Sequence, residues 1–69
     1  MKLVVHVNDS PHEVALGKTL AGLLEDLAVA HRRGVAVAVN DAVVPRADWA
    51  ARQLQVEDRV VVIAAVQGG

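Results

Sequence analysis

The feature that most constrains the fold is an apolar run near the end of the chain, RVVVIAAV at residues 59–66. Its β-branched Val and Ile side chains favour a strand. Because apolar residues occupy odd and even positions alike, both faces of this strand need cover from water. Glu57 and Asp58 form a turn signal immediately before it. We therefore predict a strand in the middle of a sheet, with a neighbouring strand on each edge.

The first strand is predicted at residues 2–8, KLVVHVN, and it runs into the sequence Asn-Asp-Ser-Pro. Each of these four residue types favours a reversal of the chain for a local reason. A hairpin that places Asn8 opposite Pro11 pairs Val5 with Val14, and one face of the hairpin is then apolar.

Leucines at helical spacing predict one amphipathic helix of about three turns, which begins after Thr19 as its N-cap. The apolar positions are Leu20, Leu23, Leu24, Leu27 and Ala28. Arg32 and Arg33 are predicted at the carbonyl end of this helix, where cations suit the helix dipole. Gly34 is predicted to end the helix in the left-handed conformation.

The alternating segment VAVAVN at residues 35–40 predicts a strand with valines on one face and alanines on the other. Asn40 and Asp41 tolerate the positive φ angles of a hairpin turn, so residues 42–44 can return as a short strand that Pro45 ends. The next segment, RADWAARQL, is too short for a full helix and predicts about one or two turns.

The order of elements is a hairpin, a helix, two short strands, a turn-like segment and a last strand, which indicates an α+β fold. The first and last strands are strongly apolar and a helix separates them, so we predict that they pair in parallel in mid-sheet. This arrangement is the ubiquitin-like β-grasp, a mixed sheet of about four to five strands packed on one helix. Residues 1–66 are assigned to this domain and residues 67–69 to a flexible Gly-Gly tail.

The size and charge of the chain restrict its function. A domain of 69 residues buries only about 60% of the surface that its unfolded form exposes, which leaves little room for a deep substrate cavity. A binding or carrier module is therefore favoured over an enzyme. The net charge of −1 supplies no basic footprint for nucleic acid or an anionic membrane, so proteins are the predicted partners.

The chain contains no cysteine, and we predict no targeting segment, which favours the reducing cytoplasm as its location. The histidines at positions 6, 12 and 31 have no acidic or sulfur ligands at metal-site spacing. No metal site is predicted.

The chain ends on Gly68 and Gly69, which finish a strand poorly because glycine loses the most backbone freedom on ordering. One interpretation is a trailing terminus, where small residues collect. The other is a tail that threads a narrow channel and presents its carboxylate to another protein's active site. A carboxylate that attacks the α-phosphate of a nucleotide becomes an acyl-adenylate. Since the chain has neither a glycine-rich phosphate loop nor a cysteine, it is predicted to be a carrier and substrate, not the enzyme.

The stretch NDAVVPRADWA contains Asn40, then Val44, Pro45 and Arg46, then Trp49 three residues after the arginine. Together with the Gly-Gly end and the β-grasp order, this pattern resembles the ThiS family of sulfur carrier proteins. Members of that family carry an Asn, a Val-Pro-Arg and an aromatic residue at this spacing. The resemblance covers nearly the whole chain.

By this resemblance, a ThiF-like activating enzyme uses ATP to adenylate Gly69, and a sulfur donor system converts the adenylate to a thiocarboxylate. The loaded tail then gives its sulfur to a ThiG-like thiazole synthase during assembly of the thiamine thiazole ring. The carrier binds no cofactor of its own. Gln67 departs from the small or apolar residue expected before the glycines, which leaves other acceptors open. Related carriers feed sulfur to molybdopterin, cysteine, tRNA or secondary-metabolite pathways.

Partner docking is predicted on the exposed face of the last strand near Val61 and Ile63, because a patch beside the tail would hold the tail in register. Arg46 and Trp49 are predicted to shape the docking surface. Two hypotheses from other classes stay open. One is a ubiquitin-like modifier that ends in an isopeptide bond to a lysine, and the other is a plain interaction module without carboxyl chemistry.

Overall fold

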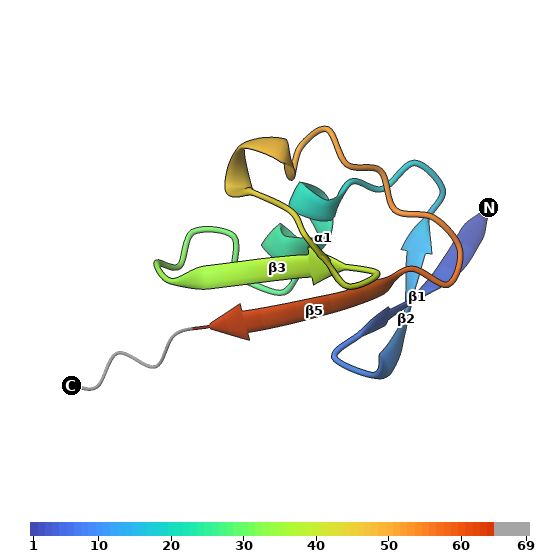
Figure 1. Cartoon of the computed structure of the whole chain (residues 1–69). Coiled ribbons are helices and arrows are strands. Elements are labelled where there is room, and N and C mark those ends of the chain that lie inside the picture. The colour runs from blue at the N-terminus through green and yellow to red at the C-terminus, as the bar shows by residue number, and fades with distance from the viewer. Residues whose placement is uncertain (65–69) are drawn as a thin grey trace.

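The protein folds as a mixed β-sheet with one α-helix across one face (Figure 1). The structure is a computed structural model, and it describes residues 1–64. In chain order its elements are β1 (Lys2–Val7), β2 (Ser10–Ala15), α1 (Leu20–Asp26), β3 (Val35–Val39), β4 (Ala42–Val43), the short 3₁₀-helix η1 (Arg46–Asp48) and β5 (Arg59–Ala64). The described strands form one sheet in the order β2-β1-β5-β3-β4. The predicted α+β class and β-grasp arrangement are confirmed.

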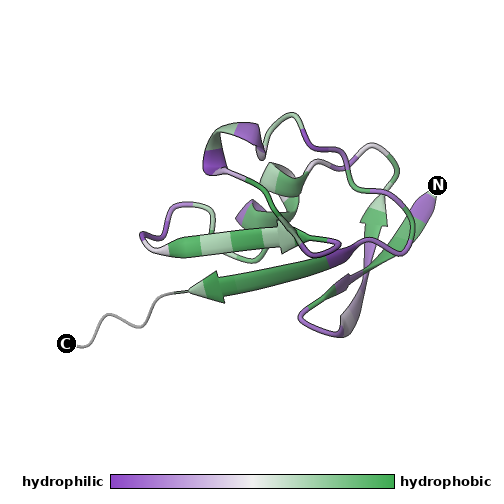
Figure 2. Ribbon diagram, in the orientation of Figure 1, coloured by the Kyte–Doolittle hydropathy of each residue, from purple (hydrophilic) through white to green (hydrophobic). Residues whose placement is uncertain are grey.

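Strand β5 is central because both of its edges are paired. It runs parallel to β1, where Val7 pairs with Val60, and antiparallel to β3 from Val60 to Ala64. Figure 2 shows hydrophobic residues along almost the whole of β5. The prediction that the last strand is central and parallel to the first is therefore confirmed.

The turn of the β1–β2 hairpin has the predicted length of two residues but lies one residue earlier in the chain than predicted, at Asn8 and Asp9. Asn8 and Asp9 have φ angles of 48° and 71°, and a two-residue type I′ turn requires positive values at both positions. The predicted register, which put Asn8 opposite Pro11, is therefore wrong by two residues. Because side chains alternate faces with a period of two, the shift leaves each apolar side chain on its predicted face, and Val5 and Val14 are both buried.

Helix α1 begins as predicted. Thr19 has an extended backbone, and its Oγ1 accepts a hydrogen bond from the backbone N–H of Gly22 at 3.1 Å, as an N-cap should. The helix face that packs on the sheet consists of Leu20, Leu23 and Leu24, all buried. Burying each of these leucines stabilises the fold by about 2 kcal/mol.

The helix ends earlier than predicted. Its last residue is Asp26, because Ala28 takes the left-handed conformation at a φ of 62°. The N–H groups of residues 28 and 29 donate to carbonyls of the last turn, which is the Schellman arrangement. The predicted positions of Arg32 and Arg33 at the carbonyl end, and of Gly34 as the residue that ends the helix, are therefore wrong.

The turn between β3 and β4 forms where predicted. Asn40 and Asp41 have φ angles of 51° and 71°, so this hairpin also has a two-residue turn of the primed type. β4 is one residue shorter than predicted, and the chain turns away at Pro45 into η1. The segment after β4 then lies on the same side of the sheet as α1 (Figure 1).

The core lies between α1 and the facing side of the sheet, and the segment after β4 contributes two large side chains to it. Its buried apolar residues are Val5, Val7, Val14, Leu20, Leu23, Leu24, Val37, Val39, Trp49, Leu54 and Val60. Within residues 1–64, no helix combines the length and the apolarity needed to cross a membrane. The predicted boundary between a domain at residues 1–66 and a tail at residues 67–69 lies outside the described residues.

Candidate functional site

An exposed apolar patch covers part of the sheet face opposite α1. On β5, Val61 is 40% exposed and Ile63 is 61% exposed, while the alternate residues turn toward the core. Their cross-strand neighbours on β3 are the small Ala38 and Ala36, and on β4 Val43 is exposed. We call Val43, Val61, Ile63, Ala36 and Ala38 the open-face patch. Val61 and Ile63 thus lie on an exposed face as predicted, and partner docking there stays a prediction.

The open-face patch lies at the root of the C-terminal segment. Val35 pairs with Ala64, the last described residue, so β5 passes through the patch and ends at its margin. The predicted tail residues Gln67, Gly68 and Gly69 lie outside the described residues.

Asparagines at the two hairpin turns fix the course of β5 from both edges. Asn8 bonds both backbone groups of Val62: its Oδ1 accepts from the N–H at 2.9 Å and its Nδ2 donates to the carbonyl at 3.3 Å. On the other edge, Asn40 Oδ1 accepts from the N–H of Arg59 at 2.9 Å, and its Nδ2 donates to Asp58 Oδ1 at 3.0 Å. The side chains of Asn8 and Asn40 therefore add hydrogen bonds to β5, whose pairing with β1 covers only two residues on each strand.

Sequence reasoning missed these contacts. The available signal is the repeated Asn-Asp pair at residues 8–9 and 40–41, since both pairs form turns that point an asparagine at β5. Asp58, recognised only as a turn residue, is 5% exposed. Its Oδ2 accepts from the N–H of Gln55 at 2.8 Å and lies 3.3 Å from the guanidinium of Arg52. This paired carboxylate closes the turn from which β5 starts.

Arg46 and Trp49 form a brace on the helix side of the sheet. Trp49 is 4% exposed, and its Nε1 donates to the carbonyl of Val44 at 2.9 Å. The Arg46 guanidinium lies 4.5 Å from the centroid of the indole ring and donates to the carbonyls of Ala30 and Arg32. These contacts tie η1 to the loop after α1, which gives the Val-Pro-Arg-x-x-Trp motif a structural purpose.

The four predicted docking residues therefore fall into two groups. Val61 and Ile63 share the open face, whereas Trp49 is part of the core beneath the opposite face. Arg46 is exposed, but its guanidinium is engaged within the chain. A docking role for Arg46 and Trp49 stays a prediction, and their internal contacts account for their geometry.

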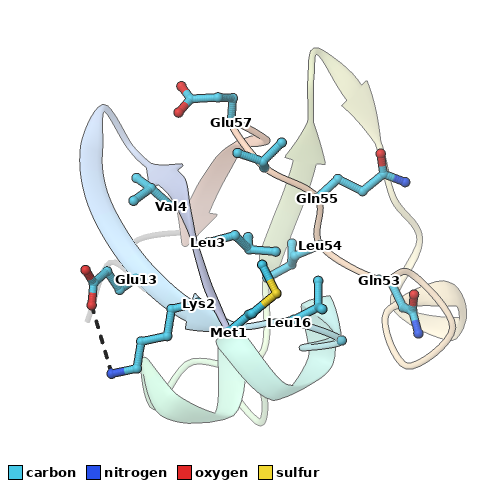
Figure 3. A pocket seen from close by; sticks show the side chains of 12 residues that line it. Met1, Lys2, Leu3, Val4, Glu13, Leu16, Gln53, Leu54, Gln55 and Glu57 are labelled. Carbon is cyan, nitrogen blue, oxygen red and sulfur yellow. Dashed lines mark ion pairs between the residues drawn. The ribbon is translucent and has the colours of Figure 1, made fainter.

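An apolar cleft of about 700 Å³ lies elsewhere, between the start of β1 and the loop before β5 (Figure 3). Leu16 and Leu54 point into it, and Lys2 and Glu13 face each other at its rim at 4.0 Å. Because β1 and β5 run in parallel, the beginning of β1 lies at the opposite end of the sheet from Ala64. The cleft is therefore separate from the root of the tail.

The described residues present an exposed apolar surface, the open-face patch, but no group of side chains suited to a metal ion. Within residues 1–64, no group of three or more His, Cys, Asp or Glu side chains could hold a metal ion. The His6 ring pairs with Glu57 at 3.0 Å beside a shallow hollow.

Comparison with known protein families identifies the family of this chain. The ThiS family model matches residues 5–69 of the chain. The chain belongs to the ThiS family. It is 36% identical over 62 residues to the sulfur carrier protein ThiS of Escherichia coli, and the alignment covers 90% of this chain and 92% of that protein. The resemblance found in the Val-Pro-Arg-x-x-Trp stretch and the Gly-Gly end is confirmed.

Solved ThiS structures share the fold. The crystal structure of ThiS from Geobacter metallireducens matches with a TM-score of 0.80 at 29% identity, over 97% of this chain and all 100% of that one. The NMR structure of a thiamine biosynthesis protein from the same organism gives a TM-score of 0.79 at 29% identity, over 97% and 88% of the two chains. The β-grasp is thus the fold of this ThiS-family chain.

A second relative is a longer protein, and only part of it is similar to this chain. The thiazole synthase of Magnetococcus marinus is 42% identical over 65 residues, which are 94% of this chain and 20% of that protein. This chain therefore spans about a fifth of the length of that relative.

Proposed function

We propose that this protein is a sulfur carrier for formation of the thiamine thiazole ring, with the carboxyl carbon of Gly69 as the acting atom. The observation that carries the proposal is the family match, which extends through residues 68–69, where the sulfur would be held. The relatives named as a sulfur carrier protein and a thiazole synthase support the same pathway.

The proposed loading has two steps. The Gly69 carboxylate attacks the α-phosphate of ATP, pyrophosphate leaves, and an acyl-adenylate forms. Hydrosulfide delivered by a donor system then attacks the acyl carbon, AMP leaves with the electrons of the C–O bond, and a thiocarboxylate remains once the sulfur has lost its proton. Adenylation matters because AMP is a far better leaving group than the oxygen of a free carboxylate.

In this proposal the chain is a substrate and its partners are the catalysts. A ThiF-like enzyme binds ATP and adenylates the tail, and a ThiG-like thiazole synthase receives the sulfur. The chain has no cysteine, so the sulfur nucleophile comes from the donor system. Because loading consumes ATP, we place the carrier in the cytoplasm, where ATP is supplied.

The test is the mass of the C-terminal peptide after incubation with ATP, the activating enzyme and a sulfur donor. We expect one oxygen of Gly69 to be exchanged for sulfur. The peptide is measured because oxidation of Met1 adds nearly the same mass to the intact chain. An unchanged peptide, with an enzyme that loads its own carrier in a parallel reaction, contradicts the proposal.

We further propose that the activating enzyme docks on the open-face patch. Large apolar side chains that stay exposed together mark interaction sites more often than scattered ones do. Val61 and Ile63 project from the strand that leads to the tail, and Asn8 and Asn40 hold that strand in place. A partner seated on this patch would therefore receive the tail in a fixed register.

Substituting Ile63→Glu tests the docking proposal. A charge at the centre of an apolar interface costs about 2 kcal/mol or more, so we expect the rate of loading at limiting carrier to fall about 30-fold. The matched control is Val56→Glu, because Val56 is 65% exposed, close to the 61% of Ile63, and lines the separate cleft. Both variants should keep the far-UV circular dichroism of the parent chain. Equal loading by the two variants would show that the patch does not contact the enzyme.

A further inference from the structure

The loop between α1 and β3 carries two arginines, Arg32 and Arg33, that do not lie at the end of the helix, where the sequence predicts them. The sequence predicts that Arg32 and Arg33 interact with the dipole at the carbonyl end of the helix. The helix ends at Asp26, and the dipole acts only within the last turn. The two guanidinium groups therefore need another explanation.

This loop lies beside the root of the tail. Val35, the residue that follows it, starts β3 and pairs with Ala64 at the end of β5. Figure 1 shows the loop next to that end of β5. We call Arg32 and Arg33 the basic pair.

The backbone of the loop is fixed, and both arginine side chains are left on the surface. Arg46 Nη2 donates to the carbonyl of Arg32 at 2.9 Å, and the N–H of Arg32 donates to the carbonyl of Val29 at 3.1 Å. Arg32 and Arg33 are both exposed. The loop thus presents two cations from a braced backbone, which lowers the entropy lost when a partner binds them.

The basic pair also differs from the other basic side chains in the charges around it. The others form ion pairs or bond carbonyls: Lys2 with Glu13, Lys18 with Asp26, Arg52 with Asp58, Arg59 with Asp41, and Arg46 with the loop carbonyls. Within residues 1–64, the guanidinium groups of Arg32 and Arg33 form neither kind of contact. The Lys and Arg side chains of residues 1–64 that lack such a contact are thus both in the loop beside the end of β5.

We propose that the basic pair binds an acidic surface of the ATP-dependent activating enzyme, beside the channel that takes the tail. This inference rests on the proposed function and adds a second contact to the open-face patch. Opposite charges on the two partners would speed their encounter and set the orientation of the carrier.

Two considerations favour a protein surface, and specifically that of the activating enzyme, as the partner of the basic pair. An extended segment of five residues spans up to about 17 Å, so with the tail in a channel Gly69 lies beyond the reach of an arginine near Ala64. The basic pair is therefore matched to a protein surface and not to the phosphates of the nucleotide. The activating enzyme is selected because its proposed docking site, the open-face patch, adjoins this loop: Val35 pairs with Ala64, and the next residue, Ala36, pairs with Ile63 of the patch.

The test compares two double variants with equal loss of charge. Arg32→Gln with Arg33→Gln removes the basic pair, whereas Lys2→Gln with Lys18→Gln removes two cations near the separate cleft. The measurement is kcat/KM of the activating enzyme with the carrier as the varied substrate, at low and high ionic strength. We expect the basic-pair variant to lose about tenfold at low salt, mainly through KM, and to show a weaker salt dependence than the parent chain. The lysine variant should stay within about twofold of the parent.

The outcomes separate the inference from the function. Normal sulfur loading of the parent chain, with equal kcat/KM for the two double variants, overturns the basic-pair proposal and leaves the carrier function standing. A defect confined to sulfur transfer onto the thiazole synthase overturns the assignment to the activating enzyme. Failure of the parent chain itself to load overturns the proposed function, and the basic-pair proposal with it.

Discussion

Deleting Gly69 is expected to reduce sulfur loading by more than about 100-fold. The deletion shortens an extended tail by about 3.5 Å and leaves the carboxylate of Gly68 at its end. A misplacement of only about 1 Å between reacting groups can cost 100-fold in rate. The measurement is the rate at which the C-terminal peptide gains sulfur, compared with that of the intact chain.

The shortened chain should still compete with the intact chain for the activating enzyme, because Val61 and Ile63 are unchanged. Gln67→Ala is the matched control, since it alters the tail without changing its length, and it should load at close to the normal rate. Equal activity of the shortened and intact chains would identify a plain interaction module, in which the terminal carboxyl has no chemical task.

Much of the fold could be predicted because its signals are local. Thr19 before regularly spaced leucines specifies where the helix starts, and its Oγ1 makes the expected capping bond. Asn-Asp pairs at residues 8–9 and 40–41 specify turns because Asn and Asp adopt positive φ more readily than most residues. The apolarity of β5 on both faces correctly indicated a strand with two neighbours.

Two details depend on tertiary contacts and could not be predicted from local patterns. The helix ends with Ala28 in a conformation that glycine usually supplies, and Val29 beyond it packs against the core, as the Schellman motif favours. In the first hairpin, the predicted and observed registers differ by two residues and place the same side chains inward. The hydrophobic pattern therefore cannot choose between them.

The candidate site was predictable to a similar extent. Alternation along β5 is enough to place Val61 and Ile63 on one face, and the structure shows that face exposed. By contrast, the contact of Arg46 with Ala30 joins residues 16 positions apart and has no local signature. The same holds for Asn8, whose partner Val62 is 54 positions away.

Replacing Trp49→Ala is expected to destabilise the protein by about 3–5 kcal/mol. Trp49 is a large buried side chain, and its loss opens a cavity among the α1 leucines and the sheet valines. A domain of this size has a total stability of only about 3–10 kcal/mol, so the variant should be largely unfolded or melt at a much lower temperature. Urea unfolding followed by far-UV circular dichroism measures the effect, since fluorescence is lost with the chain's one tryptophan.

Trp49→Phe keeps the result interpretable if the alanine variant does not fold. Phenylalanine retains most of the buried ring but leaves the Val44 carbonyl without its indole donor, so we expect a loss of about 1–2 kcal/mol. Val43→Ala, at an exposed position, should change the stability by less than about 0.5 kcal/mol. Because Trp49 lies beneath the face opposite the open-face patch, the folded phenylalanine variant should load sulfur normally. Impaired loading by that variant, at a temperature where it is fully folded, would instead give Trp49 the docking role that its burial argues against.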